Sequence, residues 1–60
     1  MEKARIYYKG ECVDVVKYDI FSIQDGKYIF ENKIEGSSLT DLVAIFTDDH
    51  SIVFQKKIIY

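Results

Sequence analysis

The sequence predicts an all-β fold, an antiparallel meander of five or six short strands in one small domain spanning residues 1–60. Two glycine-containing dipeptides, Lys9-Gly10 and Asp25-Gly26, each lie between runs of residues with high strand propensity. Further along, the runs 42–46 and 52–54 are apolar at every position, a pattern that favours strands buried on both faces. Short strands joined by tight turns indicate a small β domain.

The first hairpin is expected around Gly10, because a residue without a Cβ adopts the positive φ of a tight turn at little cost. This register gathers apolar side chains on one face, and it places Arg5 opposite Asp14, a favourable cross-strand pair. A two-residue loop predicts these opposed pairs: Tyr8–Glu11, Tyr7–Cys12, Ile6–Val13, Arg5–Asp14 and Ala4–Val15.

The second hairpin is expected at Asp25-Gly26, which is among the strongest short-range hairpin signals. A one-residue slip would scatter its aromatic side chains over both faces, so the register is well specified. The predicted pairs are Gln24–Lys27, Ile23–Tyr28, Ser22–Ile29 and Phe21–Phe30. No turn dipeptide separates the two hairpins, so we expect one long strand from Glu11 to Gln24 that bends or bulges near Tyr18-Asp19.

The stretch from Leu39 to Phe54 is expected to form a third hairpin, with its turn at 47–51, and to supply the core. An alternative is a meander with one short helix at 38–47, since Ser38 suits an N-cap and the apolar spacing is helical. The β-branched residues of the segment favour a strand. The apolar end 58–60 is expected to pack on the N-terminal strand and close the sheet. By strand count and size, the closest architecture is an SH3-like barrel.

Length and composition limit the chain to a small core. Sixty residues bury only about 60 % of the surface that the unfolded chain exposes, so 48 % apolar and 15 % aromatic residues must supply the stability. One unpaired cysteine and the lack of a targeting segment indicate a cytoplasmic protein without a disulfide. No apolar run approaches the roughly 20 residues of a membrane span, so no membrane contact is expected. Seven lysines to one arginine are typical of an AT-rich bacterial or phage genome.

The sequence predicts no enzyme, no catalytic residues, no cofactor and no metal. Cys12 lies among acidic residues, which disfavour a reactive thiolate. Asp48-Asp49-His50 is the only cluster of metal-binding residue types, but neighbouring residues of one loop rarely converge on an ion, and these types are also typical of turns. We therefore interpret this cluster as a turn.

The remaining candidates are surfaces. Exposed tyrosines and the apolar C-terminus favour a protein-interaction or regulatory module whose partner is an unknown protein or, in a homodimer, a second copy. The alternative is a small barrel that binds single-stranded nucleic acid through Tyr7 and Tyr18 and nearby lysines; acids close to each lysine make a nucleic-acid partner less favourable. The predicted interaction surface comprises Tyr7, Lys17, Tyr18, Ile58, Ile59 and Tyr60.

Overall fold

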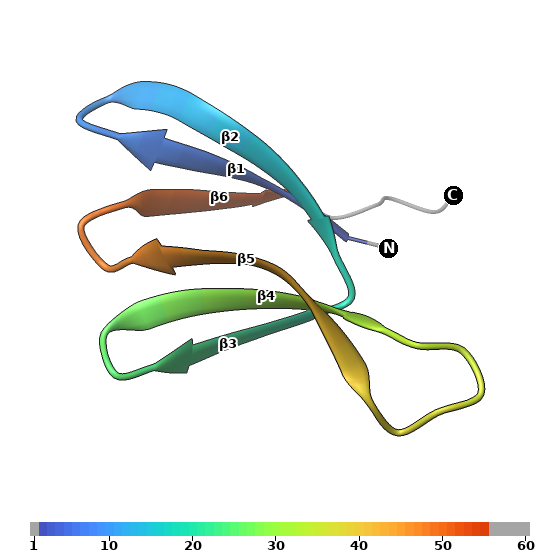
Figure 1. The fold of residues 1–60 in the computed structure, drawn as a ribbon. Helices are drawn as coiled ribbons and strands as arrows, with labels where there is room; N and C mark the ends of the chain where they lie inside the picture. The colour runs from blue at the N-terminus through green and yellow to red at the C-terminus, as the bar shows by residue number, and fades with distance from the viewer. Residues whose placement is uncertain (1, 56–60) are drawn as a thin grey trace.

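The computed structural model describes residues 2–55, which form six antiparallel strands in two three-stranded sheets (Figure 1). Sheet A has the strand order β2-β1-β6 and sheet B the order β3-β4-β5. The strands are β1 (Glu2–Tyr8), β2 (Glu11–Tyr18), β3 (Ile20–Gln24), β4 (Lys27–Lys33), β5 (Thr40–Thr47) and β6 (Ser51–Gln55). The all-β prediction is confirmed, and the alternative helix at 38–47 is wrong because β5 occupies that segment. Within the described range, no helix is long and apolar enough to span a membrane.

The β1–β2 hairpin forms at the predicted turn, where Lys9 and Gly10 have φ of 50° and 81°. The pairs Tyr8–Glu11 and Tyr7–Cys12 are confirmed, but the rest of the predicted register is wrong. A bulge beyond Tyr7 inserts one extra residue in β2, so each following partner shifts by one position. The observed pairs are Ile6–Asp14, Arg5–Val15, Ala4–Val16, Lys3–Lys17 and Glu2–Tyr18. Val13 and Val15, predicted on the apolar face, are therefore about half exposed, whereas Val16 is buried.

The β3–β4 hairpin has the predicted register throughout, from Gln24–Lys27 to Phe21–Phe30. Asp25 and Gly26 both have positive φ, 51° and 70°, as a type I′ turn requires. The Asp48 N–H donates a hydrogen bond to the Gly26 carbonyl over 3.0 Å, so this turn is tied to the turn that follows β5.

The long strand expected from Glu11 to Gln24 bends at Asp19, as predicted, and passes there from sheet A to sheet B (Figure 1). The Asp19 N–H donates to the Glu31 carbonyl over 3.0 Å, and the Asp19 carboxylate accepts a bond of 2.8 Å from the Lys33 N–H. Both bonds fasten the corner to β4. A corner of this kind lets one strand contribute to two sheets.

The predicted hairpin between 42–46 and 52–54 is wrong, although both strands and their turn exist. β5 pairs with β4, and β6 pairs with β1, where Lys3 lies opposite Gln55. Each strand thus occupies an edge that an earlier hairpin left open. As a result, the sheets do not close into a barrel within residues 2–55. The predicted closing segment 58–60 lies outside the described residues.

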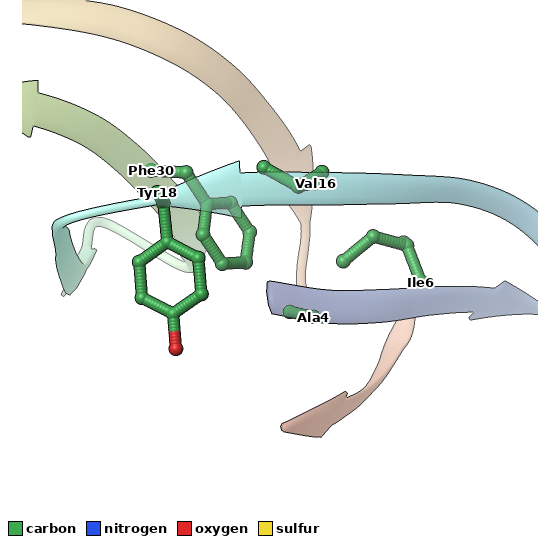
Figure 2. Close-up of a cluster of buried hydrophobic side chains, with 5 residues drawn as sticks. All are labelled: Ala4, Ile6, Val16, Tyr18 and Phe30. Atoms are coloured by element: carbon green, nitrogen blue, oxygen red, sulfur yellow. The ribbon is translucent and has the colours of Figure 1, made fainter. Parts of the chain in front are cut away.

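The core lies between the two sheets and is small. Its five buried residues are Ala4, Ile6, Val16, Tyr18 and Phe30 (Figure 2). Phe30 comes from sheet B and is fully buried, with its ring centroid 5.0 Å from that of Tyr18 and 5.1 Å from that of Phe21. Figure 2 shows the ring of Tyr18 beside Phe30, with its hydroxyl pointing away. Partly buried side chains surround this cluster: Phe21, Tyr28, Ala44, Phe46 and Ile52.

Candidate interaction surface

Large apolar side chains are more often exposed than buried in the described part of the chain. Nine are exposed, and six of these lie between Leu39 and Phe54. The expectation that this stretch supplies the core is therefore mostly wrong: Ala44, Phe46 and Ile52 are partly buried against the core, and the exposed Phe54 ring lies 6.2 Å from that of Tyr18. The exposed set comprises Val13, Val15, Ile23, Leu39, Leu42, Val43, Ile45, Val53 and Phe54.

Two of these side chains, Leu42 and Ile45, lie on face B, which we define as the side of sheet B pointing away from the core. Phe30 points into the core, so its strand neighbour Ile29 lies on face B, and Ile45 is the cross-strand partner of Ile29. Leu42 lies opposite Glu31 in the next row. Ile45 is 49 % and Leu42 61 % exposed. Face B therefore carries apolar residues across β4 and β5 that no described residue covers.

Two edge strands, β5 of sheet B and β6 of sheet A, lack protective charges. β5 has no charged residue from Leu42 to Thr47, and β6 has none from Ser51 to Gln55. By contrast, the edge strand β2 contains Asp14 and Lys17, and the edge strand β3 is short. Charged residues and short strands are common means of preventing an edge from pairing with another chain. β5 and β6 are thus the two unprotected edges among the described strands.

Face A, which we define as the side of sheet A pointing away from the core, has a different chemistry. Ala4 and Ile6 point into the core, so their neighbours Lys3, Arg5 and Tyr7 lie on face A. Its rows across the sheet are Val15–Arg5–Val53, Lys17–Lys3–Gln55 and Cys12–Tyr7–Ser51.

The cations of face A are not neutralised within residues 2–55. Lys3 lies directly opposite Lys17, a like-charged pair that costs stability. Neither these lysines nor Arg5 forms an ion pair with another described residue. The acidic residues of the sheet occupy core-side positions of the register, where Glu2 is opposite Tyr18 and Glu11 opposite Tyr8. Face A is therefore basic, although the whole chain has a net charge of −2.

The predicted surface residues are separated by the fold. Tyr7 and Lys17 lie on face A, Tyr7 half-buried and Lys17 exposed. Tyr18 was wrongly predicted to be at the surface: it is 7 % exposed, because the bulge in β2 turns it toward the core. Burial raises the pKa of its phenol, and the Glu2 carboxylate adds to the shift. Ile58, Ile59 and Tyr60 lie outside the described residues.

The prediction missed Arg5, Leu42, Ile45 and Val53 as surface candidates. The sequence did contain a pattern that indicates exposure of Leu42, Ile45 and Val53. Apolar runs without a single charge were interpreted as core, but the same pattern is expected for an edge strand that a partner covers.

The turn at 48–50 is confirmed as a turn and has a defined hydrogen-bond network. His50 Nδ1 lies 3.0 Å from the Thr47 carbonyl oxygen and 2.9 Å from Asp49 Oδ1. Both oxygens are acceptors, so Nδ1 carries the proton. The Thr47 hydroxyl donates to the Asp49 carboxylate, which lowers the pKa of that carboxyl, and His50 contributes further.

His50 also connects the sheets. Its ring centroid is 4.9 Å from that of Tyr8 at the end of β1 and 5.4 Å from that of Phe46 on β5. No three His, Cys, Asp or Glu side chains in the described range are grouped to hold a metal ion. The His50 turn is thus a structural contact between sheet A and sheet B.

No protein-family model matches the sequence, and no curated protein or solved structure is significantly similar to it. The function therefore has to be inferred from the chemistry of the two faces.

Proposed function

We propose that this chain is a non-enzymatic protein-interaction or regulatory module of the cytoplasm, which binds its protein partner through face B and β5. The supporting observation is the excess of exposed over buried large apolar side chains, concentrated in residues 39–54. Contiguous exposed apolar surface on a small domain marks interaction sites, because its exposure to water is unfavourable.

The composition of β5 supports the same proposal. An uncharged run of six strand residues at a free edge would pair with another strand, either of this chain or of a partner. Apolar residues at the centre with acids at the rim, such as Asp41 before the run and Asp48 after it, match the usual arrangement of an interface. The exposed, unpaired Cys12 is compatible with a reducing compartment.

The proposal extends to the architecture. If β6 pairs with the free edge of β5, the two sheets become the SH3-like barrel that strand count and size predict, and the partner then binds face B on the outside of that barrel. Amide NOEs between the two strands would demonstrate this pairing, and amides of β6 that contact only β1 would exclude it.

Site-specific photo-crosslinking tests the proposal. A photoreactive amino acid replaces Ile45 on face B, and the matched control replaces Ile23, which is 64 % exposed on the opposite edge strand of the same sheet. We expect a discrete protein adduct, either with a second copy or with another protein, from position 45 in a cell extract and a much weaker one from position 23. Equal crosslinking from both positions, or none from position 45, would refute the proposed function.

A further inference from the structure

The strand register separates the cations of face A from the acids that lie close to them in the sequence. Lys3 and Lys17 each have an acid within two positions, a pattern that by itself makes a nucleic-acid partner less favourable. In the fold, Glu2 occupies a core-side position, and the Asp19 carboxylate accepts a hydrogen bond from β4. Within residues 2–55, the three rows of face A thus contain three cations and no acid.

Lys3 and Lys17 form a cross-strand pair whose repulsion no described residue relieves. Their Cβ atoms are about 5 Å apart, and a pair of like charges at this position is destabilising. A domain of this length has little stability to spare for such a cost. An anion between the two ammonium groups would turn the repulsion into attraction, and Arg5 continues the positive charge one row further, about 7 Å along β1. The arrangement therefore suits a ligand that carries several negative charges in a row.

Face A also presents an aromatic ring. Tyr7 lies in the row next to Arg5, is half-buried, and has no aromatic ring packed against it in the described part of the chain. Bases of nucleic acids stack on such rings with little dependence on sequence, because every base has a π face. The other tyrosines in this range are each packed on another ring, at centroid distances of 4.9 to 5.9 Å: Tyr8 on His50, Tyr18 on Phe30 and Tyr28 on Phe21.

We propose that face A binds single-stranded nucleic acid, with phosphates on Lys3, Lys17 and Arg5 and a base stacked on Tyr7. Small β domains that bind single strands combine a cationic surface along the backbone with aromatic stacking platforms. A duplex keeps its bases inside the stack, whereas the unstacked bases of a single strand can reach an aromatic side chain. Face A points away from sheet B, so this site does not depend on the proposed function of face B.

The number of phosphate contacts sets the salt dependence. Three contacts with a single strand give a slope of log K against log salt of about −2, so binding should weaken about 20-fold between 50 and 200 mM salt. The dissociation constant should lie at about 1–100 μM, as for sequence-independent binding. The net charge of −2 opposes binding only weakly, because sheet B lies about 10 Å away, which is one screening length at 0.1 M salt.

Fluorescence anisotropy of the full chain with a labelled oligothymidine of about ten nucleotides tests the proposal. Lys17→Gln and Lys27→Gln form a matched pair, because each removes one exposed lysine and changes the net charge equally, but Lys27 lies on face B opposite Thr47. We expect Lys17→Gln to weaken binding about five-fold at 0.1 M salt and to reduce the steepness of the salt slope by about 0.7. Lys27→Gln should bind like the wild type.

The same variant separates loss of binding from loss of folding. Gln at position 17 ends the repulsion with Lys3, so Lys17→Gln should unfold at a higher urea concentration than the wild type while binding more weakly. A second pair tests the stacking. Tyr7→Phe should bind oligothymidine like the wild type, and Tyr7→Leu should bind it at least about five-fold more weakly, with an unchanged circular dichroism spectrum. An abasic oligomer with the same phosphate backbone should bind more weakly than oligothymidine and should not distinguish these two variants.

Several results would overturn the proposal. These are no binding of oligothymidine at 50 mM salt, equal losses in Lys17→Gln and Lys27→Gln, and equal binding by Tyr7→Phe and Tyr7→Leu. An abasic oligomer bound as tightly as oligothymidine would assign face A to polyanions in general, and decaglutamate bound more tightly would assign it to an acidic protein. Tighter binding of a duplex would exclude the stacked base. None of these results affects photo-crosslinking from position 45, so the proposed function of face B is tested separately.

Discussion

Replacement of Phe30 should test whether the small core between the sheets holds the fold together. Phe30 is fully buried, and its ring lies 5.0 Å from Tyr18, 5.1 Å from Phe21 and 6.1 Å from Phe46, measured between ring centroids. Removal of a buried phenylalanine to alanine costs about 3–5 kcal/mol. A 60-residue domain has a free energy of unfolding of about 3–9 kcal/mol, so Phe30→Ala should leave much of the chain unfolded.

The conservative variant Phe30→Leu makes the effect measurable. We expect it to lower the free energy of unfolding by about 1–1.5 kcal/mol, since it loses the ring contacts but keeps most of the volume. With a urea dependence of about 1 kcal/mol per M, the unfolding midpoint measured by circular dichroism should fall by about 1 M. The control Ile23→Ala, at a position 64 % exposed, should change the free energy of unfolding by less than about 0.5 kcal/mol. Equal midpoint shifts for Phe30→Leu and Ile23→Ala would show that Phe30 is not the centre of the core.

Three further predictions concern single positions. Gly26→Ala should destabilise the fold by about 1–2 kcal/mol in urea unfolding, more than Gly10→Ala, because a Cβ at Gly26 would lie 3.2 Å from Asp48 Oδ2 whereas one at Gly10 would contact nothing; equal losses would contradict this. The pKa of Asp49 is lowered by folding, so the stability that its carboxylate contributes is present above about pH 4 and is lost as the pH falls further. Asp49→Asn should therefore flatten the acid part of a melting-temperature profile, and a profile as steep as that of the wild type would contradict this. Folding raises the pKa of Tyr18, so the unfolded chain ionises first and stability should fall as the pH rises above about 10. Tyr18→Phe should reduce that fall in the same measurement, and an unchanged fall would show that Tyr18 is not its source.

Much of the fold was predictable because its signals are local. The turns at Gly10 and Gly26 need positive φ, and period-two alternation around Asp25-Gly26 fixed every pair of the β3–β4 hairpin. The corner at Asp19 was also predictable, since a long β run without a turn dipeptide must bend to remain in a small domain. Of the candidate surface residues, the structure places Tyr7, half-buried, and Lys17, exposed, on face A.

The bulge in β2 was not predictable from the same signals. One extra residue after Cys12 exchanges the two sides of the strand, and the alternating pattern of the hairpin is compatible with either register. That single shift moved Tyr18 from the predicted surface into the core and left Val15 beside Arg5 on face A.

By itself, the sequence determined where the strands lie and which turns join them, because turn geometry and side-chain alternation depend on residues close together in the chain. Only the tertiary structure decided that β5 joins β4 and β6 joins β1. Strand edges pair through backbone groups that are the same in every residue, so an apolar run does not specify which edge it will occupy. For that reason residues 39–54, which hold the two uninterrupted apolar runs, lie largely at the surface.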